Sequence, residues 1–66
     1  MQLISTETDG ATVRLTSGDL LMLSNALNEV CNRLDVSEFS TRMGVQHEDA
    51  LVLLQEIGQL YRNVSA

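Results

Sequence analysis

The residues best suited to chemistry in this sequence are its single histidine, cysteine and tyrosine. His47 is followed directly by Glu48 and Asp49, and all three side chains are of the kind that binds metal ions. Neighbours one and two positions apart do not share a face of a helix, so no metal site within one chain is expected here. We therefore interpret His47 as an exposed residue at the start of a helix.

Cys31 lacks the surroundings of a reactive thiol. Its neighbours are apolar, and Arg33, the basic residue within a turn, points elsewhere on a helix, so a thiolate gains no stabilisation. We interpret Cys31 as a small core residue. An enzyme would have to build its site from Cys31, His47 or Tyr61, and their spacing indicates none. The sequence predicts no enzymatic activity and no cofactor.

The segment Thr16-Ser17-Gly18-Asp19 allows two interpretations. Backbone N–H groups at the start of a helix attract anions, but the carboxylate of Asp19 would oppose a bound anion. Asp19 also lies three residues after Thr16, which is a weaker form of the capping box. We favour the helix cap.

Composition and charge exclude further classes of function. The chain has 66 residues, with nine acidic residues against four arginines and a net charge of −5, which predicts one domain over residues 1–66. A general nucleic-acid binder carries a basic face, so nucleic acid is not the expected partner. Apolar runs are too short to cross a membrane. With one cysteine and no signal peptide, we expect a cytoplasmic protein.

The first sixteen residues predict a β-hairpin. Asp9-Gly10 is typical of a two-residue turn in which both residues have positive φ. The expected pairs on the apolar face are Thr8 with Ala11, Thr6 with Val13 and Ile4 with Leu15. Because a lone hairpin is not stable in water, this face should pack on helices, or a strand edge should pair with another chain.

Three helical segments follow, so the expected fold class is α+β in the order ββααα, with two main helices and a short one between them. The first helix starts after Thr16 or Ser17 and ends near Leu34. Its expected buried stripe consists of Leu20, Leu23, Leu27, Val30 and Leu34. The short helix is capped by Ser37, and Gly44 suits the left-handed position after it. The last begins near Gln46 or His47. Its expected buried side consists of Ala50, Leu53, Leu54, Ile57, Leu60, Tyr61 and Val64.

Residues 39–54 also resemble a helix-turn-helix, with a short helix, Met43-Gly44-Val45 and a second helix. In that family the second helix enters the major groove of DNA. Here that helix begins with Glu48 and Asp49, which would face a polyanion. A helix-turn-helix regulator that acts as a dimer is the alternative function.

One face of the first long helix is unusually polar. Asn is a poor helix former, because its side chain competes for backbone groups, yet this helix holds three. The face is either solvated or a surface for a protein partner, framed by a salt bridge between Glu29 and Arg33. The candidate partner-binding residues are Asn25, Asn28, Glu29, Asn32 and Arg33.

Two stretches, NALNEVCN at residues 25–32 and EFSTRMG at residues 38–44, resemble a group of small bacterial proteins without a characterised activity. The resemblance covers residues 20–57. It implies a bacterial origin and no particular function.

The sequence therefore predicts a small acidic protein-interaction module, in its most concrete form an inhibitor or adaptor like an immunity protein or antitoxin. An acidic surface suits a basic protein partner. The apolar arc of the last helix is wider than a hairpin and one helix can cover, which predicts a homodimer. Gly58 would allow close approach of another helix, either the first helix of the same chain or the last helix of a second copy. The candidate dimer or close-packing residues are Leu51, Leu54, Gly58 and Tyr61.

Overall fold

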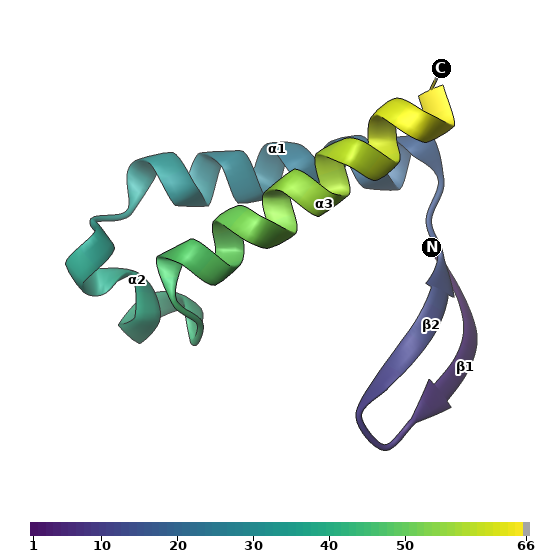
Figure 1. The fold of residues 1–66 in the computed structure, drawn as a ribbon, viewed down its shortest axis with the longest axis horizontal. Helices are drawn as coiled ribbons and strands as arrows, with labels where there is room; N and C mark the ends of the chain where they lie inside the picture. The colour runs from purple at the N-terminus through teal and green to yellow at the C-terminus, as the bar shows by residue number, and fades with distance from the viewer. Residues whose placement is uncertain (66) are drawn as a thin grey trace.

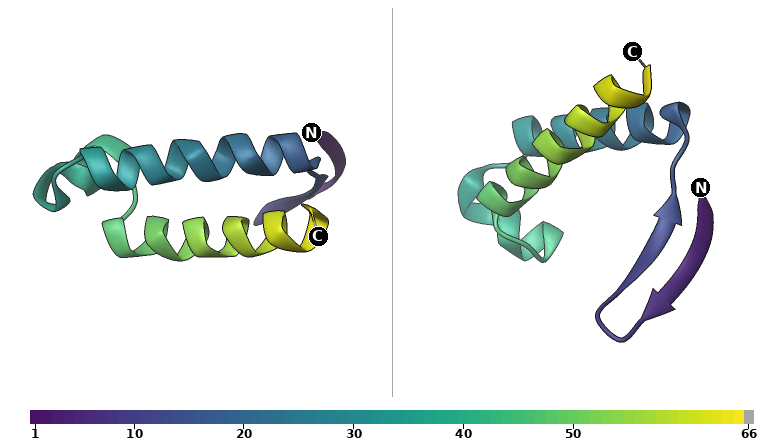
Figure 2. Two further views of the ribbon diagram at one scale, coloured as in Figure 1. Left: turned by 90° about the horizontal axis from the view of Figure 1, so that it is seen from above. Right: turned by 45° about the vertical axis from the view of Figure 1, so that its right-hand side comes forward.

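The structure is a computed structural model that describes residues 1–65. Two strands, β1 (Gln2–Glu7) and β2 (Gly10–Arg14), are followed by three helices, α1 (Ser17–Arg33), α2 (Val36–Met43) and α3 (His47–Ser65). This confirms the α+β fold with ββααα order. The long helices α1 and α3 run antiparallel side by side and form one layer, and α2 turns the chain between them (Figures 1 and 2).

The hairpin turn lies one residue earlier than expected. Glu7 pairs with Gly10, so Thr8 and Asp9 form the turn, and neither Asp9 nor Gly10 has a positive φ. Thr6 therefore pairs with Ala11 rather than Val13. The predicted register was wrong because turn preference alone decided it. Neither face of this sheet is buried, so no burial selects between registers.

The hairpin also stands away from the helices, against the expectation that it packs on them. Every residue of β1 and β2 is exposed, and within the described residues neither strand packs on a helix. Figure 1 shows the sheet descending from one end of the helix layer. A bulge between Leu3 and Ser5 brings Leu3 opposite Val13 near the open end of the sheet. Both sheet edges and both faces are therefore open.

The start of α1 is the predicted capping box. The Asp19 backbone N–H donates to Thr16 Oγ1, and the Thr16 N–H donates to Asp19 Oδ2, each at 3.1 Å. The amino group of Met1 lies 2.7 Å from the same carboxylate. That ammonium group, with the Thr16 N–H, lowers the pKa of Asp19. Asp19 thus satisfies the helix end itself, as the cap interpretation requires.

The α2 segment begins earlier than Ser37. Its N-cap is Asp35, whose side chain makes no capping hydrogen bond, and Ser37 lies inside the helix. The predicted end is confirmed: Gly44 has φ 77° and its N–H donates to the carbonyl of Ser40 at 2.9 Å. The left-handed turn at Gly44 lets α3 return along α1.

The core is small and lies mainly at the α2 end. Phe39 is fully buried with Cys31 and Ala50, and Val30 and Leu34 pack against this cluster. Leu20 and Ile57 are the other buried apolar residues. Other positions expected in the core are exposed, because α1 and α3 cover only one side of each other. They are Leu23, Leu53, Leu60 and Val64.

Candidate functional site

His47 is half-buried rather than exposed. Its Nε2 lies 3.0 Å from the Cys31 carbonyl oxygen. Because a carbonyl only accepts, Nε2 carries the proton and donates. The ring meets Phe39 edge to face, with centroids 4.9 Å apart. The prediction was wrong because α3 begins in contact with α2, and the imidazole there packs against Phe39. His47 thus joins α3 to α1 and α2.

The acidic neighbours of His47 lie apart from its ring. Glu48 and Asp49 are exposed while His47 turns inward, as helix geometry predicts for adjacent positions. Within residues 1–65, no three His, Cys, Asp or Glu side chains come together as metal ligands. Cys31 is a free thiol buried in the core cluster, in line with its structural interpretation.

The five residues predicted as a partner-binding face lie exposed along α1. Arg33 Nε is 2.9 Å from Glu29 Oε1, which is the expected salt bridge. The Asn32 amide donates to Asn28 Oδ1 at 3.1 Å. Two side-chain pairs, each four residues apart, therefore lie along the half of α1 that leads to α2.

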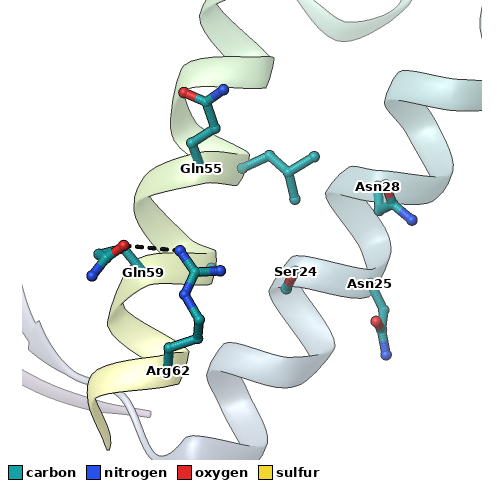
Figure 3. Close-up of a pocket in the computed structure, with 8 residues that line it drawn as sticks. Ser24, Asn25, Asn28, Gln55, Gln59 and Arg62 are labelled. Atoms are coloured by element: carbon teal, nitrogen blue, oxygen red, sulfur yellow. Dashed lines mark hydrogen bonds between the residues drawn. The ribbon is translucent and has the colours of Figure 1, made fainter.

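A polar groove between α1 and α3 extends this face. It has a volume of about 490 Å³ and contains two of the predicted residues, Asn25 and Asn28. Figure 3 shows Arg62 extending along the groove, opposite α1. Its Nη2 donates to Gln59 Oε1 at 2.8 Å. We call this the amide groove, and its lining residues are Ser24, Asn25, Asn28, Leu54, Gln55, Gly58, Gln59 and Arg62.

The α3 side of the amide groove was missed from the sequence. Gln55, Gly58 and Arg62 are three and four residues apart, so they share one flank of the helix. The same spacing rule that identified the asparagines of α1 would have found this polar flank. It was overlooked because the apolar stripe of α3 dominates the pattern.

Gly58 lies in the amide groove and not against another helix of this chain. A Cβ atom built there would meet only Arg62 Nη1, at 3.7 Å, which is ordinary contact. The close approach of α1 that we considered for Gly58 is therefore absent. Leu54 and Tyr61 are half-buried, and Leu51 is exposed.

The α2–α3 corner has the outline of a helix-turn-helix but not its charge. Arg42, the cation of this corner, lies 3.5 Å from Glu38. Glu48 and Asp49 are exposed at the start of α3, and His47 contacts the protein interior. Arg42 is therefore paired, and the start of α3 presents two exposed carboxylates.

Across residues 1–65, no helix combines the length and hydrophobicity that a membrane span requires. Comparison with protein-family models, curated proteins and solved structures finds no match for this chain.

Proposed function

We propose that this chain is a small acidic, non-enzymatic protein-interaction module, and that the amide groove receives a segment of its protein partner. The observation that carries this proposal is the composition of the groove. Amide side chains of both long helices line the groove together with one guanidinium group, and its lining includes no carboxylate.

Such a lining matches the chemistry of a polypeptide. Asn and Gln amides both donate and accept hydrogen bonds, so they pair with the N–H and C=O groups of an extended chain. Arg62 adds further donors, suited to a carbonyl or carboxylate. The groups in this groove thus favour binding over proton transfer or nucleophilic attack.

The charge of the whole chain favours a basic partner. A net charge of −5 steers a positively charged protein toward this one, and this long-range attraction raises the association rate more than the final affinity. An inhibitor or adaptor of the immunity or antitoxin kind is the concrete form that we propose. A toxin gene next to the gene for this chain would support it.

We further propose that the module works in a bacterial cytoplasm. The resemblance of residues 20–57 to small bacterial proteins supports the origin. A domain of this size usually carries disulfides in an oxidising compartment, whereas the one cysteine here is a buried free thiol.

Capture of the partner on immobilised protein tests the role of the groove. Wild-type chain, the groove variant Gln55→Ala/Gln59→Ala and the control Asn63→Ala are compared with lysate of the source organism. Asn63 is an exposed amide on the same helix but outside the groove lining. We expect one basic protein on wild type and control and its loss on the groove variant. Equal capture by all three would show that the groove is not the binding site.

The helix-turn-helix alternative has one observation in its favour, the left-handed Gly44 between α2 and α3. A mobility-shift experiment with random and genomic duplexes separates the two functions. We expect no binding at physiological salt. Sub-micromolar binding that weakens steeply with salt would replace the interaction module by a DNA regulator.

A further inference from the structure

The side of the helix layer away from the amide groove is apolar. Leu53, Leu60 and Val64 follow one another at intervals of seven and four residues along α3, so they share a flank, opposite that of Gln55, Gly58 and Arg62. Leu23 occupies the corresponding flank of α1. These four residues, which we call the arch face, are between 40% and 55% exposed.

The arch face lies between two projections of the chain. Figures 1 and 2 show α2 and the hairpin descending from the same side of the helix layer, at opposite ends. Val30 and Leu34 pack against the Phe39 cluster at the α2 end. Leu23, on the same flank of α1, lines a hollow with Met1 and Leu15 at the base of the hairpin. The molecule is therefore an arch with an apolar inner side.

The solvent-accessible surface of the chain is larger than expected for a compact monomer of this mass. A folded monomer of this mass exposes about 4,200 Å², whereas this chain exposes 5154 Å². The excess of about 1,000 Å² is close to what one partner buries in a standard protein interface, about 800 Å². The radius of gyration, 13.2 Å, likewise exceeds the value of about 11 Å typical of this length.

The arrangement of elements leads to the same conclusion. Domains consist of at least two packed layers around a core, and here the long helices form one layer with the arch face uncovered. Within the part of the chain that the structure describes, five apolar residues are buried, while fifteen large apolar side chains remain exposed. A second layer has to come from outside the described chain.

We propose that the second layer is a second copy of this chain, which packs its own arch face against this one about a two-fold axis. Such a contact uses the same patch on both copies, and apolar, core-like surfaces are typical of permanent homodimers. The four residues of the arch face carry no charge, so packing them together buries no ionised side chain among them. The proposal goes beyond the partner contact proposed above, because it concerns the opposite side of the helix layer.

This assignment differs from the dimer patch expected from the sequence. Leu51 and Gly58 lie on the flank of α3 that belongs to the amide groove, and Leu54 and Tyr61 are half-buried toward α1. If the arch face is the contact, the groove remains open on the outside of the dimer. Each dimer then presents two grooves to partners.

Matched substitutions on α3 distinguish the two flanks. Leu60→Lys places an ammonium group on the arch face, and Leu51→Lys places the same group on an exposed leucine of the other flank. We expect wild type and Leu51→Lys to sediment as dimers, and Leu60→Lys to raise the dimer dissociation constant at least about a hundred-fold, because an unpaired charge would be buried. Dissociation by Leu51→Lys alone, or a wild-type monomer at micromolar concentration, would overturn the proposal.

A second measurement covers the case in which the separated chain unfolds. The melting temperature of a wild-type dimer rises with protein concentration, since association stabilises only the folded state. Leu60→Ser, a milder change, should lower the melting temperature at a given protein concentration more than Leu51→Ser, which has the same loss of helix propensity on the other flank. A wild-type melting temperature that stays constant over about a hundred-fold range of protein concentration, from micromolar upward, would exclude the dimer, because association must add stability over that range. Capture of the basic partner is a separate measurement, so the arch-face dimer and the partner contact at the amide groove can each fail without the other.

Discussion

The two ends of the helix layer are held by different means. At the α2 end, Phe39 is fully buried, and His47 of α3 donates a hydrogen bond to the carbonyl of Cys31 in α1. At the hairpin end, the exposed sheet is joined to α1 through the Thr16–Asp19 capping box and the ion pair of Met1 with Asp19. The α2 end has an apolar core, whereas the hairpin is attached beside the buried Leu20 by polar contacts.

This difference indicates which end of the molecule is stable in the monomer and which end would gain stability from a second chain. Burial of apolar area is the main favourable contribution to folding, and the α2 corner has it. Exposed ion pairs contribute little, and a two-stranded sheet alone is marginal in water. The hairpin end is therefore the less stable end of the monomer. It is also where hydrogen exchange should be fastest and where a second copy would add most order.

Phe39→Ala should have the largest effect. Removing a fully buried phenylalanine costs about 3–5 kcal/mol, through lost burial and the cavity that remains, and the edge contact with His47 is lost as well. For a domain of this size we expect loss of most helical structure in circular dichroism at 25 °C. The control Val36→Ala, at an exposed position on the same helix, should leave the spectrum unchanged. Equal loss in both variants would mean that the α2 end is not a core.

Cys31→Ser comes next and probes the same end more gently. The substitution puts a hydroxyl into an apolar cluster and should lower the free energy of unfolding by about 1–3 kcal/mol, as measured by urea denaturation. Alkylation of the native thiol should be slow and should accelerate only with denaturant. Rapid labelling of the folded protein would contradict the burial of Cys31.

At the hairpin end, Thr16→Ala should cost about 1 kcal/mol, which is typical for the loss of an N-cap side chain. Chemical denaturation gives the value, and Thr41→Ala, an exposed threonine within α2, serves as the comparison. If the two variants lose the same stability, the capping box does not hold this end.

The same cap predicts that the stability of the fold depends weakly on pH in the acid range. The pKa of Asp19 is lowered in the folded chain by the Met1 ammonium and the Thr16 N–H. Its contribution is thus fully present above the ordinary value of 3.8 and is lost as the pH falls through the lower folded value. The melting temperature of the wild type should decline more steeply below pH 4 than that of Asp19→Asn. If the melting temperatures of the two proteins fall in parallel with pH, Asp19 does not contribute to the acid dependence of stability.

Much of this fold follows from the sequence, and two of the exceptions share a cause. Local rules correctly predicted the capping box at Thr16 and the left-handed Gly44, because neighbouring residues alone determine such features. The turn register at Asp9-Gly10 and the exposure of His47 were predicted wrongly. Both depend on which surfaces meet in space: no layer covers the hairpin, and α2 covers the histidine.

The candidate site divides in the same way. Asn25 and Asn28 were identified from the composition of one helix face. Their partners across the groove, Gln55 and Arg62, come from a helix thirty residues further along, and only the antiparallel packing of α1 and α3 brings them together. The arch face was read as core because its spacing is that of a buried stripe. Periodicity indicates that a side is to be covered, but not by which chain.

Gly58→Ala should have the smallest effect and the opposite sign. Gly58 lies midway along α3, between the two ends, where Ala favours a helix by up to about 1 kcal/mol. The added methyl would meet only Arg62 Nη1 at 3.7 Å, so no packing opposes this gain. We expect a small rise in melting temperature, unchanged mass in light scattering, and a normal dimer if the arch face is the contact. Loss of stability or of the dimer would instead mean that a second chain approaches Gly58 on the groove side, and the contact would then move from Leu60 to the flank that carries Leu51.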